Sequence, residues 1–121
     1  MRLTGDCIVF TIDKENYSIS IDDILYVFSK GNYSRIFTKD NESSFLLCKT
    51  LKYVELSLRK FDFYRVSRGI LINQNHVLKI DSGTTSWVMM SNGERFPVAF
   101  RRRQEFLELY QEKQPVLNQS F

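Results

Sequence analysis

The chain is poor in the residues that build metal centres and disulfide frameworks. Its 121 residues include two cysteines, Cys7 and Cys48, and a single histidine, His76. The cysteines stand far apart and lack the spacing of metal ligands, so we predict neither a zinc site nor any other metal site. Two lone thiols fit a reducing compartment, and we therefore expect a cytoplasmic protein.

Long apolar runs are also missing. No run of roughly 18 apolar residues is present, so we expect no transmembrane helix and no membrane partner. The chain starts with a short polar lead that contains Asp6 and lacks the apolar region of a signal peptide.

Motifs for catalysis are equally scarce. The isolated glycines do not form a phosphate-binding loop. Asp22 and Asp23 are adjacent, which is typical of a turn or cap rather than of a catalytic pair. Ser67 has no histidine close to it in the sequence and no nucleophile-elbow motif around it. We therefore predict no enzymatic activity and no cofactor.

Apolar and aromatic residues, in contrast, are abundant. The chain is 43% hydrophobic and includes ten phenylalanines and six tyrosines, which is enough for a core and favours strands. Its length suits one domain. We expect this domain to span residues 1–121, with a core at about 7–110 and a loosely held tail at 111–121.

Alternating apolar and polar residues, separated by turn residues, predict a mainly β fold. The expected strands cover residues 7–12, 17–21, 24–28, 33–38, 45–48, 77–80, 84–90 and 94–98. The expected turns cover residues 13–16, 22–23, 31–32, 39–42, 73–75, 81–83 and 91–93. Two amphipathic helices are predicted at residues 50–60, with Thr50 as the N-cap, and at 101–113. Phe106, Leu107 and Tyr110 are expected to form the apolar stripe of the second helix.

Basic residues gather at three places where elements are expected to end. The net charge of +3 permits an anionic partner without requiring one. Lys30 and Arg35 flank the turn at Gly31 and Asn32. In residues 61–73 Arg65 and Arg68 stand between an aromatic run and an apolar run, and the three arginines 101–103 open the last helix. An ordinary buried strand with solvated arginines would give the same pattern in residues 61–73.

Six segments in this order resemble the LytTR DNA-binding domain family. They are residues 23–26 (DILY), 31–33 (GNY), the helix at 50–60, residues 63–68 (FYRVSR), 71–73 (LIN) and the pair 92–93 (NG) with 96–98 (FPV). The resemblance implies an elongated fold of about ten short strands in several sheets, and bacterial transcription control. It also implies loops inserted into successive major grooves of double-stranded DNA, and it allows a homodimer on repeated half-sites. Such domains are often joined to a receiver or sensor domain, and this chain is either a stand-alone domain or an excised piece.

Carried over by position, the resemblance implies DNA contacts at three segments. The implied residues are Lys30, Asn32, Tyr33, Ser34, Arg65, Ser67, Arg68, Arg101 and Arg102. Arg68 is the main candidate for base contact, because a guanidinium can donate two hydrogen bonds to guanine. Lys30 and Arg65 are expected to contact phosphates.

The chain departs from the family pattern at three positions. The family usually has histidine at the position of Ser67, and serine followed by arginine at the positions of Ala99 and Phe100. Ala99 cannot cap the last helix through its side chain, and Phe100 cannot donate a hydrogen bond. The alternative function is therefore a protein-interaction module that keeps the fold without specific DNA readout.

Overall fold

The computed structural model describes residues 1–40, 44–81 and 86–113, with side chains described as far as residue 110. The strands among these residues are β1 (Arg2–Thr4), β2 (Cys7–Ile12), β3 (Glu15–Ser20), β4 (Ile24–Lys30), β5 (Tyr33–Thr38), β6 (Ser44–Leu47), β7 (Phe63–Ser67), β8 (Ile70–Asn73), β9 (Val77–Asp81), β10 (Trp87–Met90) and β11 (Arg95–Pro97). The α-helices are α1 (Leu51–Ser57) and α2 (Arg103–Lys113), and the 3-10 turns are η1 (Ile21–Asp23), η2 (Gln74–His76) and η3 (Phe100–Arg102).

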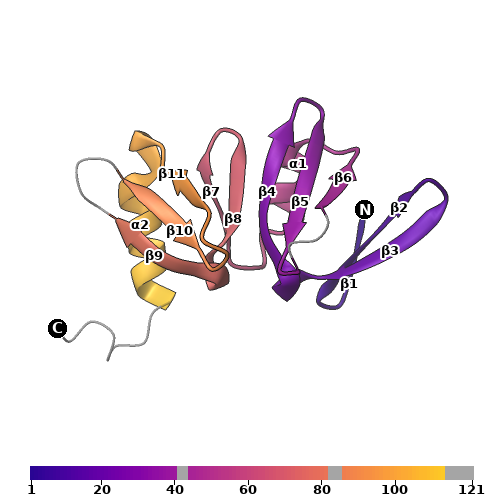
Figure 1. The fold of residues 1–121 in the computed structure, drawn as a ribbon, viewed down its shortest axis with the longest axis horizontal. Helices are drawn as coiled ribbons and strands as arrows, with labels where there is room; N and C mark the ends of the chain where they lie inside the picture. Colours follow the sequence, from indigo (N-terminus) through magenta and orange to yellow (C-terminus); the bar gives the residue numbers. More distant parts are fainter. Residues whose placement is uncertain (41–43, 82–85, 114–121) are drawn as a thin grey trace.

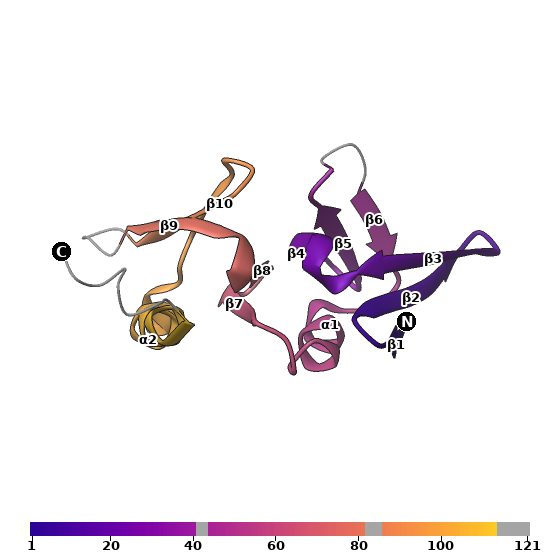
Figure 2. The same ribbon diagram turned by 90° about the horizontal axis from the view of Figure 1, so that it is seen from below.

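The strands form three antiparallel sheets that follow one another along the long axis of the molecule (Figure 1). Their orders are β1-β2-β3, β6-β5-β4-β8-β7 and β11-β10-β9. Figure 2 shows α1 and α2 on the same side of the molecule, both seen nearly end on. The predicted mainly β, elongated fold of several small sheets is thus confirmed.

Strand β4 is buried on both faces because it belongs to two hydrophobic cores. Val27 of β4 packs in the core beneath the first sheet and α1, together with Leu71 of β8. The neighbouring Tyr26 packs in the second core, with Ile72 of β8 and with Phe106 of α2. A strand that is covered on both sides needs apolar residues at successive positions, which explains the continuous apolar run of residues 24–28.

Helix α1 begins as predicted but is shorter than predicted. The Thr50 side chain accepts a hydrogen bond from the Tyr53 backbone nitrogen at 3.2 Å, as expected of an N-cap. The helix then ends at Ser57 instead of residue 60. Leu58, which is fully buried, leaves the helical conformation, with φ −100° and ψ 13°. The chain turns there to deliver Phe63 to the start of β7, so tertiary pairing overrides the helical pattern.

The last helix also starts differently from the prediction. Residues Phe100–Arg102 form a 3-10 turn, and α2 begins at Arg103 rather than at residue 101. Phe106 is buried and its ring contacts that of Tyr110, as the predicted stripe requires. Leu109, rather than Leu107, is the leucine that packs against the second core.

Three further findings complete the comparison with the predicted elements. Residues 61–73 form a hairpin of two strands, β7 and β8, where the sequence suggested a single buried strand. The polar lead contains a strand, β1, that pairs with β2. Parts of the predicted turns at 39–42 and 81–83, the start of the predicted strand at 84–90, and the predicted loose tail beyond residue 113 lie outside the described residues.

Candidate nucleic-acid interface

Three loops lie along one long edge of the molecule, the upper edge in Figure 1. The first loop, residues 29–33, contains the turn between β4 and β5. The second loop, residues 67–69, joins β7 to β8. The third loop, residues 99–102, leads from β11 into α2. Each corresponds to a segment that the sequence placed at DNA, so the fold brings the three predicted segments to one surface.

Hydrogen bonds connect each loop to the next. The Ser29 backbone nitrogen donates to the Gly69 carbonyl at 2.9 Å, which joins the first loop to the second. The Ala99 nitrogen donates to the Val66 carbonyl at 2.7 Å, which joins the third loop to the end of β7. Sequence reasoning did not find these bonds, because backbone groups carry no residue-specific signal. The three loops are therefore held in fixed relative positions.

The first loop presents polar and basic side chains to solvent. Gly31 has φ +62°, the positive value that the first central residue of a type II′ hairpin turn requires. Lys30 and Asn32 are exposed, and Tyr33 is 45% exposed. Ser34 differs from the other predicted contact residues because it is fully buried and its hydroxyl donates to the Lys49 carbonyl at 2.8 Å. It anchors the hairpin and is not accessible to DNA.

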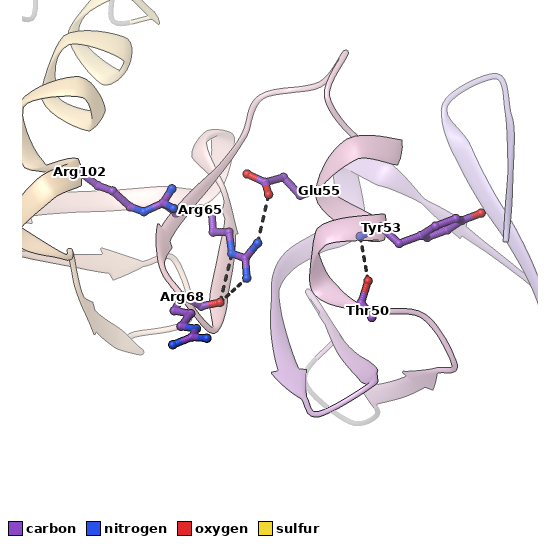
Figure 3. Close-up of polar contacts among 6 residues, drawn as sticks. All are labelled: Thr50, Tyr53, Glu55, Arg65, Arg68 and Arg102. Atoms are coloured by element: carbon purple, nitrogen blue, oxygen red, sulfur yellow. Dashed lines mark hydrogen bonds and ion pairs between the residues drawn. The ribbon is translucent and has the colours of Figure 1, made fainter.

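Arg65 and Arg68 of the β7–β8 hairpin have different environments (Figure 3). Arg68 is exposed, and its guanidinium points away from the chain. The Arg65 side chain is only 18% exposed and forms an ion pair with Glu55 of α1 at 3.3 Å. Its Nε and Nη2 also donate to the Arg68 carbonyl, the former at 3.1 Å. Arg65 thus supports the backbone of the residue that faces solvent, and its phosphate contact stays a prediction, because in this structure its guanidinium binds Glu55 and the Arg68 carbonyl.

The third loop combines an exposed ring with an exposed charge. Phe100 is 80% exposed, and Arg101 beside it is exposed as well. Arg102 is half-buried, and its Nη1 donates to the Arg65 carbonyl at 2.9 Å. Ala99 makes no side-chain cap, as its lack of a hydroxyl predicted. Ser67 of the second loop is also half-buried.

An acidic residue in the first turn of α2 offsets the unfavourable effect of the nearby arginines on the helix dipole. Arginines near a helix N-terminus oppose the helix dipole, whereas Glu105 in the same turn favours it. The Tyr64 hydroxyl donates to the Glu105 carboxylate at 2.6 Å. Burial, and then this bond to a carboxylate, raise the pKa of the Tyr64 phenol well above its usual value near 10.

The surface formed by the three loops is positively charged. It carries Lys30, Arg68, Arg101 and Arg102, and its segments contain no aspartate or glutamate. Such a surface attracts a polyanion, and its fixed backbone lowers the ordering cost of binding one.

Within residues 1–40, 44–81 and 86–110, whose side chains are described, no three histidine, cysteine, aspartate or glutamate side chains are placed to hold a metal ion. His76 Nε2 donates to the Asp22 carbonyl, so the only histidine of the chain supports the fold. In the same described ranges, no helix has both the length and the apolar character needed to cross a membrane.

Comparisons with known proteins identify the family of the chain and a similar fold. A solved LytTr DNA-binding domain from Bacillus cereus has a similar fold, with a TM-score of 0.72 and 23% sequence identity, over 88% of this chain and 97% of that one. A search of curated proteins finds no match. The family model for the LytTr DNA-binding domain matches residues 14–111, which is most of the chain. The chain therefore belongs to the LytTr DNA-binding domain family, as the sequence predicted.

Proposed function

We propose that this DNA-binding domain of transcription regulation reads a specific sequence in double-stranded DNA through its three loops. The observation that carries the proposal is the row of exposed basic side chains on three loops that backbone hydrogen bonds connect. In this proposal the loops enter successive major grooves, as the family resemblance implies. Two copies of the chain bind repeated half-sites, which the stoichiometry of the complex on duplexes with one or two half-sites tests.

Each loop side chain has a distinct role in this proposal. Arg68 donates two hydrogen bonds to a guanine, because its guanidinium is exposed on a braced backbone. Lys30 and Arg101 contact phosphates, which set the orientation of the protein on the duplex. Asn32, Tyr33 and Ser67 line the surface between them. Arg65 and Arg102 position the loops from within the protein.

The decisive experiment measures duplex affinity as a function of salt for three proteins. We expect wild type to bind a duplex selected from a random-sequence library and to weaken steeply with salt, because phosphate contacts release counterions. Arg68→Ala should lose about 1–3 kcal/mol on the selected duplex and relax the preference at one base pair. Arg68→Lys should lose most of this selectivity, because lysine keeps the charge without the planar pair of donors.

Arg59→Ala is the matched control. Arg59 is exposed and carries the same charge, but it precedes β7 and so lies at the end of that strand away from the second loop. Its loss should leave base preference unchanged. If Arg68→Ala and Arg59→Ala behave alike on every duplex, Arg68 does not read a base.

A second candidate function is a protein-interaction module, and the exposed Phe100 favours it. Phe100 is 80% exposed, and exposed aromatic residues are common anchors in protein interfaces. The same salt titration separates the two functions. A protein-only module shows no duplex binding even at low salt.

A further inference from the structure

Phe100 is the most exposed large apolar side chain among the described residues, and it lies within the basic surface formed by the three loops. The residue is 80% exposed, compared with 63% for Leu78 and 54% for Leu56. The contact of this apolar side chain with water is unfavourable in the free protein. A partner that covers the side chain removes this contact, which favours binding. Because the surrounding surface attracts a polyanion, the partner has to offer both negative charge and an apolar group.

The ring of Phe100 is held in place. The Arg103 guanidinium lies over one side of it, 4.9 Å from the ring centroid. The backbone on the N-terminal side is fixed by the bond from Ala99 to the Val66 carbonyl at 2.7 Å. On the other side, the Arg102 nitrogen donates to the Ala99 carbonyl at 2.8 Å. The exposed part of the ring is thus presented from an ordered turn, next to the exposed Arg101.

Duplex DNA offers one apolar group in its major groove, which is the C5 methyl of thymine. We infer that Phe100 packs against a thymine methyl, so that the third loop reads thymine by apolar contact. The inference rests on the proposed function, because it requires that the three loops face the major groove. It also gives a role to Phe100, a residue that departs from the family pattern.

The test replaces thymines by deoxyuridine, which removes the C5 methyl and leaves all hydrogen-bonding groups in place. Duplexes are first selected from a random-sequence library with wild-type protein. Each thymine of the selected duplex is then replaced singly, and affinity is measured by fluorescence anisotropy. We expect one position at which wild type loses about fourfold in affinity, the loss expected for one methyl group. At that position Phe100→Ala should show no loss.

Two further variants sharpen the result. Phe100→Arg should change the preference at the same base pair from thymine to guanine, because arginine pairs with guanine O6 and N7. Leu78→Ala is the matched control, since it removes a similarly exposed apolar side chain from β9, which lies towards the opposite edge in Figure 1. It should keep the wild-type deoxyuridine profile. Thermal melting should be unchanged in all three variants, which excludes misfolding as the cause.

Each outcome has a defined meaning. If wild type enriches no duplex, the proposed function fails and this inference fails with it. If wild type enriches a duplex but tolerates deoxyuridine at every position, only this inference is overturned. The same holds if Phe100→Ala and wild type lose equal affinity at the same position, because another residue then contacts the methyl.

Discussion

Replacing Arg65 with methionine distinguishes two roles of Arg65, which are to support the backbone of Arg68 and to contact DNA directly. Methionine keeps an unbranched stem of similar length and removes the guanidinium. The ion pair with Glu55 at 3.3 Å joins side chains that are 18% and 38% exposed, so its loss costs about 0.5 kcal/mol. The charged hydrogen bonds to the Arg68 carbonyl add about 1.5 kcal/mol, the lower end for a charged group, because the site is partly wet. We therefore expect unfolding to become easier by about 2 kcal/mol.

Urea unfolding measures this loss, and duplex titrations at several salt concentrations measure its consequence. Arg65→Met should remain folded, because domains have about 5–15 kcal/mol of stability. It should bind DNA more weakly, since Arg68 then starts from a looser turn. The salt slope should stay at the wild-type value if Arg65 acts only from within the protein and neutralises no phosphate. Glu55→Gln is the control, and it should lose only the ion-pair share of about 0.5 kcal/mol.

The opposite result would refute the role of Arg65 as a support for the Arg68 backbone. If Arg65→Met keeps wild-type stability but lowers the salt slope by about one unit, Arg65 contacts a phosphate directly. The sequence-based role of Arg65 would then be right, and its burial in the free protein would have to change on binding.

Three other predictions concern stability. Ser34→Ala should lower the free energy of unfolding by about 1 kcal/mol, because it removes the hydrogen bond from the buried Ser34 hydroxyl to the Lys49 carbonyl, and the salt slope of DNA binding should not change. Thr50→Ala should cost about 1 kcal/mol in the same urea assay, whereas Thr50→Ser should cost little, because serine keeps the cap. The raised pKa of Tyr64 means that the folded state keeps this proton when the unfolded state releases it, so stability should fall as the pH rises above about 10. Tyr64→Phe should flatten this alkaline fall relative to wild type, and an identical fall in both proteins would show that Tyr64 does not contribute.

Local signals in the sequence were sufficient for most strands and turns, but not for β1 or for the division of residues 61–73 into β7 and β8. The pair Gly31 and Asn32 predicts the first loop because few other residues accept its backbone geometry. Thr50 predicts the start of α1 because its side-chain oxygen can accept a hydrogen bond from a backbone nitrogen in the first turn of the helix. The end of α1 was not predictable, because it depends on where Leu58 meets the core and on where β7 has to begin. Both depend on contacts between segments that are distant in the sequence, and helical periodicity carries no information about such contacts.

The candidate site shows the same division. The sequence placed three basic segments at the interface, and the fold brings them to one edge. It assigned a base contact to Arg68 and a phosphate contact to Arg65, but it did not show that the Arg65 side chain is held inside while Arg68 faces solvent. The difference comes from Glu55 on α1 and from the turn at Gly69, which decide which arginine is held inside. The exposure of each arginine side chain depends on how the β7–β8 hairpin packs against its neighbours, so it cannot be predicted from the local sequence.

The pairing of β4 with β8 has a consequence for how the protein folds. It matches Tyr26 with Ile72 and Phe28 with Ile70, residues separated in the chain by two strands, a helix and part of the second hairpin. Closing such a long loop is entropically costly, so this pairing should form late and limit the folding rate. The bond between Ser29 and Gly69 stands at the end of the same pairing. A chain with only its local hairpins formed would therefore carry all its arginines and still lack the aligned surface of the three loops. If that surface binds DNA as proposed, the capacity to bind DNA should arise only when this late pairing forms.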